Sequence, residues 1–129
     1  MRFLGVDLAW GEGSATKPAN DTGVAALDES GTLLDAGWTI GLDETQAWIE
    51  ELASEDTLLF IDAPLVVDNA SGQRRCDRQV GQCYGRWQVS ANTINLGSKH
   101  LGGVRLRERL EQGGWLYDDG ARGQRLQAA

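Results

Sequence analysis

The chain has 129 residues, of which 41% are hydrophobic and 24% are charged, and its formal net charge at pH 7 is −7. This length and composition predict one globular domain with a hydrophobic core, which we place at residues 1–117. No apolar run is long enough to span a bilayer, and the first residues are typical of a strand rather than a signal peptide, so we expect a cytoplasmic protein that does not enter membranes.

The charges are distributed unevenly along the chain. Residues 1–72 carry 2 basic and 14 acidic side chains, whereas residues 73–109 carry 8 basic and 2 acidic ones. The basic segment has two interpretations: a solvated helical surface, or a surface that holds the phosphates of a nucleic acid. The charge pattern by itself does not choose between them.

Residues 2–10 are predicted to form the first strand, and they contain a carboxylate inside an apolar run. A buried, ionised Asp7 would lose its hydration, so it should lie at the exposed end of the strand, accept hydrogen bonds, or face a cation. Gly11 and Gly13 follow at once and favour a tight turn, whose amides are alternative partners for Asp7.

The next elements are predicted to be two strands and a helix. Residues 22–28 and 32–40 have strand character and are separated by a turn-forming segment, so we expect a hairpin that completes an antiparallel meander with the first strand. Asp43 and Gln46 have the spacing of a capping box, which predicts a helix over residues 44–53. Its inner face should carry Ala47, Trp48 and Leu52.

Residues 57–65 repeat the pattern of the first strand, because an apolar run again leads to a carboxylate, Asp62. Such a run after a helix predicts a strand that is buried on both faces and parallel to an earlier one, and Pro64 ends its hydrogen-bonding ladder. If the two strands are adjacent, Asp7 and Asp62 reach the same edge of the sheet and are close enough to share a divalent cation. A purely structural role for Asp62, capping the turn into Pro64, stays open.

The remaining segments are predicted from helical periodicity and turn residues. A helix over residues 73–84 should bury Cys76, Val80 and Cys83; with no further Cys or His pair nearby, neither zinc nor a disulfide is favoured, and we expect buried thiols. A loop over 85–97 is followed by a helix that begins at Ser98 or shortly after it and ends near residue 112. Residues 115–117 are expected to form a short strand and 118–129 a flexible tail.

This order of elements is that of a ribonuclease-H-like core, and three segments carry a family resemblance. Phe3-Leu-Gly-Val-Asp-Leu-Ala-Trp10, Ile61-Asp-Ala-Pro-Leu65 and Arg74-Arg-Cys-Asp-Arg78 resemble the bacterial and archaeal "domain of unknown function 429" proteins, described as predicted ribonuclease-H-like nucleases. The resemblance covers residues 2–117, about the first half of a typical member. It implies an α/β fold whose mixed sheet has a three-strand antiparallel meander followed by parallel strands, with helices on both faces.

The resemblance also implies a chemistry. In ribonuclease-H-like nucleases, carboxylates on the first and fourth strands hold two Mg²⁺ or Mn²⁺ ions that promote phosphodiester hydrolysis. Asp7 and Asp62 are then the metal ligands and catalytic residues, with Asp77 either a third catalytic carboxylate or an orienting partner for the arginines. The resemblance makes Arg74, Arg75 and Lys99 candidates for binding substrate phosphates.

Other interpretations remain open. Such nucleases usually take a further acidic residue from a C-terminal helix, and here Asp118 and Asp119 are candidates only by default. The chain could complete a site as a homodimer, or serve as a non-catalytic interaction module. Gly5-Val-Asp7 followed by a Gly-containing turn also resembles the phosphate-binding hairpin of actin-like ATPases and sugar kinases. The five tryptophans are expected mainly in the core, although Trp87 could stack on a base, and His100 is expected at the surface or a helix start.

Overall fold

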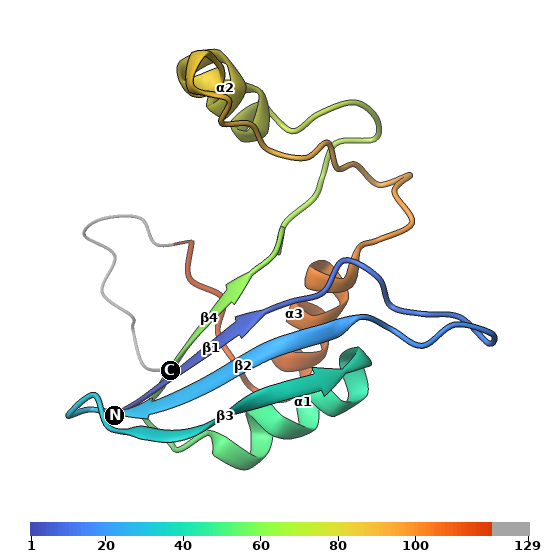
Figure 1. Cartoon of the computed structure of the whole chain (residues 1–129). Coiled ribbons are helices and arrows are strands. Elements are labelled where there is room, and N and C mark those ends of the chain that lie inside the picture. Colours follow the sequence, from blue (N-terminus) through green and yellow to red (C-terminus); the bar gives the residue numbers. More distant parts are fainter. Residues whose placement is uncertain (120–129) are drawn as a thin grey trace.

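The computed structural model of the chain describes residues 1–119, which form a mixed sheet flanked by helices (Figure 1). In chain order the elements are β1 (Arg2–Asp7), β2 (Asp21–Asp28), β3 (Leu33–Ile40), α1 (Gly41–Leu52), β4 (Thr57–Asp62), α2 (Arg75–Tyr84), the short 3-10 helix η1 (Gly85–Trp87) and α3 (Gly102–Gln112). The predicted order of strands and helices is therefore confirmed for these elements. The strand expected at residues 115–117 is wrong: the N–H of Trp115 donates to the carbonyl of Leu110, which folds this segment back against the end of α3.

The sheet has the strand order β3-β2-β1-β4. β1 pairs with β2 and β2 with β3 in antiparallel fashion, whereas β4 lies parallel to β1 on its other side. The meander and the parallel partner are thus as predicted. The first strand is shorter than expected, because the ladder ends at Asp7 rather than at Trp10.

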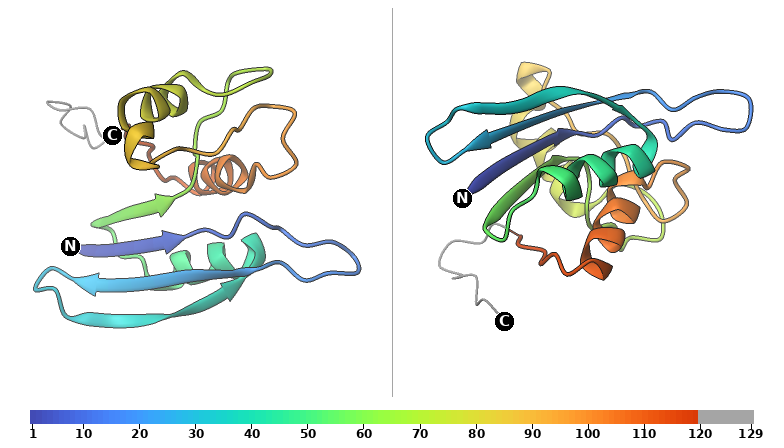
Figure 2. Two further views of the ribbon diagram at one scale, coloured as in Figure 1. Left: turned by 45° about the horizontal axis from the view of Figure 1, so that its top comes forward. Right: turned by 90° about the horizontal axis from the view of Figure 1, so that it is seen from below.

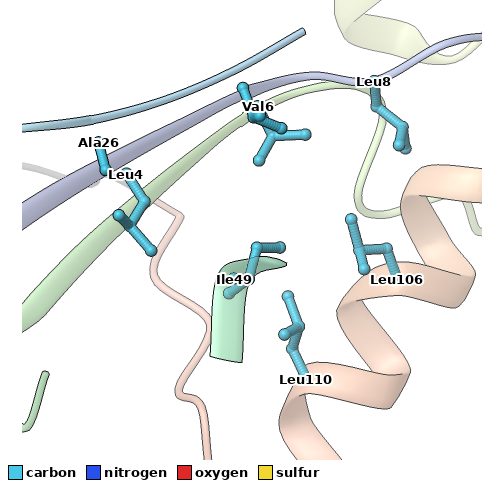
Figure 3. Packing of buried hydrophobic residues seen from close by; sticks show 8 residues of the cluster. Leu4, Val6, Leu8, Ala26, Ile49, Leu106 and Leu110 are labelled. Carbon is cyan, nitrogen blue, oxygen red and sulfur yellow. The ribbon is translucent and has the colours of Figure 1, made fainter. Parts of the chain in front are cut away.

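One face of the sheet packs against α1 and α3 to form the core (Figure 3). Successive side chains of a strand point to opposite faces, so alternate residues of β1 and β2 turn inward together. Ile49 of α1 and Leu106 of α3 are fully buried against them. The core cluster consists of Leu4, Val6, Leu8, Val24, Ala26, Ile49, Leu106 and Leu110.

The expectation of helices on both faces of the sheet is wrong. Figure 2 shows α1 and α3 on the same side, and within residues 1–119 no helix covers the other face. Trp38 of β3 is 74% exposed there and Phe60 of β4 is 61% exposed. The apolar run of β4 is typical of a strand that is buried on both faces. Hydrophobicity shows that a face avoids water, but it does not show that a helix of residues 1–119 covers that face.

Helix α1 begins earlier than predicted and without the expected capping box. Its N-cap residue is Ile40, which has no side-chain cap; instead the Glu44 carboxylate accepts a hydrogen bond from the Ile40 N–H at 2.7 Å. The inner face also differs from the prediction, because Ala47 is exposed and Ile49 lies in the core instead. The helix predicted to begin at Ser98 or shortly after it begins at Gly102, within the predicted segment.

Residues 69–96 form an arm that carries α2 and η1 away from the sheet (Figure 1). The arm is closed at its base, where the N–H of Leu96 donates to the carbonyl of Asn69 at 3.0 Å. The Asn69 side-chain amide adds hydrogen bonds to the carbonyls of Ser71, Gly72 and Ile94. The arm is therefore held by polar contacts within itself.

Because α2 stands apart from the core, its predicted inner face is wrong. Cys76 and Cys83 are free and exposed rather than buried, and Asp77 is the buried residue of the helix. The tryptophans also divide differently from the prediction. Trp48 and Trp115 pack against the core, whereas Trp10, Trp38 and Trp87 are exposed. The predicted tail lies, for residues 120–129, outside the described residues.

Candidate carboxylate site and basic arm

Asp7 and Asp62 lie side by side at the carboxyl ends of β1 and β4. The parallel register places Asp7 directly opposite Asp62, and residues opposite each other on neighbouring strands, about 4.8 Å apart, point to the same face. Both side chains are exposed. The juxtaposition predicted from the two apolar runs is therefore present.

Within residues 1–119, no hydrogen bond or ion pair engages either carboxylate. In particular, the amides of Gly11 and Gly13 do not cap Asp7, since the Gly11–Ser14 turn makes its hydrogen bonds with Lys17 and Asn20 instead. The two carboxylates thus sit next to each other without a cation from the described part of the chain. Two neighbouring carboxylates repel each other, and a nearby positive charge favours their ionised forms.

The segments that leave β1 and β4 are fixed by specific contacts. After β1, the N–H of Ala9 donates to the buried Thr22 hydroxyl at 3.0 Å. After β4, α3 packs so tightly that a Cβ on Gly103 would lie 2.5 Å from the Pro64 carbonyl oxygen. An ion pair between Glu12 and Arg105 ties the loop after β1 to α3. These contacts position the strand ends that carry the two carboxylates.

Two grooves meet at the carboxylate pair. One, of about 1000 Å³, runs over the uncovered face of the sheet, where its apolar lining includes Trp38 and Phe60. The other, of about 870 Å³, lies between the strand ends and the arm. Its polar lining besides the pair consists of Asp68, Arg74, Arg75, Asp77, Gln79, Asn92 and Asp118. The carboxylates therefore face a groove whose opposite wall carries arginine.

Arg74 and Asp77 are engaged with each other. Arg74 Nε lies 2.6 Å from Asp77 Oδ2 and Nη2 lies 2.7 Å from Oδ1, while Nη1 donates to the Val66 carbonyl at 3.1 Å. These hydrogen bonds hold the pKa of Asp77 below its ordinary value and raise the pKa of Arg74. Of the two roles open to Asp77, partner to an arginine is the one this geometry favours.

The positive charge of the groove is supplied by arginines of the arm. On α3, Arg105 pairs with Glu12 and Arg109 pairs with Asp43, so these arginines serve the fold. Arg75 is exposed and lines the groove together with the carboxylate pair. Lys99 is exposed but lies outside the groove lining, as does His100, which is at the surface.

The described residues do not bring a third ligand into a metal-binding cluster. No group of three or more His, Cys, Asp or Glu side chains suited to a metal occurs within residues 1–119. Asp118 lines both grooves, but Asp119 does not. Asp68, which sequence reasoning passed over, also lines the second groove; its signal is a lone carboxylate directly after the apolar pair Val66-Val67.

The structure thus defines an α/β protein with paired carboxylates at the ends of parallel strands and a basic helical arm beside them. A family model described as "Protein of unknown function (DUF429)" matches residues 5–119, and the chain belongs to this family. The resemblance inferred from the three sequence segments is therefore confirmed. No curated protein and no solved structure matches the chain. Among the described residues, no helix has the length and apolar character needed to cross a membrane.

Proposed function

We propose that this chain is a metal-dependent nuclease of the ribonuclease-H-like type, which hydrolyses phosphodiester bonds. The observation that carries the proposal is the in-register pair Asp7 and Asp62, which faces a groove whose other wall holds Arg75. Carboxylates at adjacent strand ends bind divalent cations, and an arginine across the groove binds phosphate. Together they fit an anionic substrate held by way of a cation.

The donor set fits Mg²⁺ or Mn²⁺. Mg²⁺ is commonly bound through one or two carboxylates, with waters and substrate phosphates completing its shell, so two exposed aspartates suffice for one ion. The two negative charges repel each other, and a cation between them relieves that repulsion. When bound, such an ion would supply Lewis-acid activation of water and of the phosphoryl group. A second ion, as in the two-metal mechanism, requires donors beyond this pair.

The residues of the chain divide the work as follows. Asp7 and Asp62 hold the cation at the strand ends. Arg75 donates hydrogen bonds to the phosphate oxygens and offsets the charge that grows on them in the transition state. Asp77 acts through Arg74, because their bidentate pair fixes the first turn of α2 and thereby the position of Arg75. Lys99 contributes longer-range attraction for the polyanion.

A second function is favoured by one specific observation. The uncovered sheet face exposes Trp38 and Phe60, and exposed apolar patches mark protein-interaction surfaces. A non-catalytic interaction module, or a homodimer that forms through this face, is therefore the alternative. The ATP-binding alternative has no comparable observation in its favour.

The first test is a calorimetric titration with Mn²⁺. We expect saturable binding to the wild type and none to the double variant Asp7→Asn, Asp62→Asn. The matched control is Glu51→Gln, Glu55→Gln, which removes the same charge at the other end of the sheet and should bind Mn²⁺ as the wild type does. Circular dichroism checks that each variant is folded. A wild type that binds no Mn²⁺, or a double variant that still binds it, would contradict the proposal.

The second test is cleavage of labelled oligonucleotides in the presence of Mn²⁺. We expect Arg75→Ala to lower kcat/KM by roughly 100- to 1000-fold, the scale on which removal of a group that stabilises transition-state charge acts. Arg109→Ala removes the same charge from a pair with Asp43 and should change kcat/KM by less than about twofold. Equal effects of the two substitutions would show that only net charge matters.

A further inference from the structure

The end of the arm carries an exposed cluster of aromatic and basic side chains. The guanidinium carbon of Arg86 lies 3.7 Å from the centroid of the Trp87 ring, which places the charge over the face of the indole. The ring of Tyr84 is 6.1 Å from that of Trp87 and inclined by 35°. Trp87 is 57% exposed and Tyr84 is 52% exposed. We call these three residues the tip.

The backbone holds the tip in place. Directly after η1, Gln88 has φ of 62°, a left-handed conformation that a residue with a side chain rarely adopts. The N–H of Gln88 donates to the Gly85 carbonyl, and that of Val89 donates to the Tyr84 carbonyl. A strained turn beside exposed aromatic rings points to a function for those rings.

The charge around the tip selects for a polyanion. Residues 69–96 contain Arg74, Arg75, Arg78 and Arg86 and one acidic residue, Asp77. Asp77 is 5% exposed and is neutralised by Arg74, so the charged side chains at the surface of the arm are all arginines. An acidic peptide would satisfy the charge but not the stacked rings, whereas a nucleic acid supplies both phosphates and flat base faces.

We propose that the tip formed by Tyr84, Arg86 and Trp87 is a base-stacking platform for single-stranded nucleic acid. This inference rests on the proposed function, since the other end of α2 carries Arg75 into the groove that contains the carboxylate pair. The 10 residues of α2 span about 15 Å. For a strand that keeps the stacked spacing of a duplex, about 3.4 Å per nucleotide, roughly four nucleotides connect the tip to the groove. A duplex keeps its base faces stacked inside, so the platform favours single strands.

The test measures binding without cleavage. Fluorescence anisotropy of a labelled 10-nucleotide oligothymidine is followed in EDTA, on the Asp7→Asn, Asp62→Asn background, at several salt concentrations. We expect Trp87→Ala to weaken binding by roughly 5- to 100-fold, the effect of losing one stacked base, and Trp87→Phe to restore most of the affinity. The slope of log K against log salt should not change in Trp87→Ala, whereas Arg78→Ala should reduce its magnitude by about 0.7.

The matched control is Val89→Ala, which trims an exposed side chain beside the tip and should bind as the parent does. Binding of a duplex of the same length should be insensitive to Trp87→Ala. The inference is overturned if Trp87→Ala binds oligothymidine as tightly as the parent, or if poly-glutamate of equal charge displaces the oligonucleotide equally well. Because this assay contains neither metal nor cleavage, it tests base stacking by the tip even if the nuclease proposal fails.

Discussion

Arg74 and Asp77 illustrate how a residue that looks catalytic in sequence is assigned by its contacts. An Arg-Arg-Cys-Asp segment contains several charged groups, and the sequence does not show which of them form ion pairs with one another. In the structure, both carboxylate oxygens of Asp77 accept from Arg74. The pair anchors α2 to the Val66 carbonyl and leaves Arg75 exposed, so one arginine is structural and its neighbour is available to a ligand.

This pair predicts how the arm responds to pH. Because Arg74 holds the pKa of Asp77 below its ordinary value, the stabilisation is complete above about pH 5 and is lost as pH falls through the lowered pKa. Asp77→Asn should lower the free energy of opening of α2 by about 2 kcal/mol at pH 7, as expected for hydrogen bonds to a charged group. Amide hydrogen exchange of residues 75–84, corrected for intrinsic rates, measures this difference.

The pH dependence is the decisive part of that experiment. The advantage of the wild type over Asp77→Asn should shrink below about pH 4, since protonated Asp77 loses the ion pair. Asp43→Asn is the control, because its pair with Arg109 is on the surface and should contribute less than about 1 kcal/mol. A wild-type advantage that stays constant down to pH 2.5 would show that the ion pair does not stabilise the arm.

Two glycines provide a matched comparison of backbone packing. A Cβ on Gly103 of α3 would lie 2.5 Å from the Pro64 carbonyl oxygen, whereas one on Gly81 of α2 would meet no atom within 4 Å. Gly103→Ala should therefore destabilise the protein by about 1–3 kcal/mol through overpacking. Gly81→Ala should stabilise α2 by about 0.5–1 kcal/mol through helix propensity. Urea unfolding measures the first effect and hydrogen exchange the second. If Gly103→Ala also stabilised the protein, the contact between α3 and Pro64 would have adjusted to the added methyl group without cost.

At the scale of elements, periodicity predicts what a segment avoids better than what it contacts. The alternation in β1 and β2 and the apolar run of β4 correctly indicate strands, and Asp7 and Asp62 could be placed together from them because parallel pairing follows from the intervening helix. The partner of each apolar face could not be read in the same way. Cys76 and Cys83 share a helical face by spacing, yet α2 has no core to bury them against.

The uncovered face of the sheet makes a prediction about stability. Phe60 is 61% exposed there, whereas Leu106 in the core is completely buried. Phe60→Ser should therefore cost less than about 1 kcal/mol, while Leu106→Ala should cost about 2–5 kcal/mol through lost burial and a residual cavity. Urea unfolding at a low and at a high protein concentration measures both. A cost for Phe60→Ser that approaches that of Leu106→Ala, and that grows with protein concentration, would show that a second copy covers this face.

At the scale of the whole molecule, the structure shows where the basic segment of the sequence lies. The basic segment of residues 73–109, predicted as one surface, separates into α3, where Arg105 and Arg109 each pair with one carboxylate of the acidic half, and the arm, where Arg75 and Arg78 face solvent. Sequence could not make this division, because Glu12 and Asp43 lie 93 and 66 residues from their partners. Only the fold brings such distant charges into contact.

The carboxylate pair Asp7 and Asp62 predicts how the stability of the whole protein depends on a divalent metal ion. A ligand that binds only the folded state stabilises it, by about 2.7 kcal/mol at 100 times its Kd. For a domain of this size that corresponds to a rise in Tm of roughly 10 °C or more. Differential scanning calorimetry should show this rise with Mn²⁺ for the wild type and its reversal by EDTA.

The double variant Asp7→Asn, Asp62→Asn should show no rise in Tm with Mn²⁺. Its metal-free Tm should be at or above that of the wild type, because the repulsion between the two carboxylates is gone. A double variant whose metal-free Tm falls well below that of the wild type would instead show that Asp7 and Asp62 hold the strand ends together themselves.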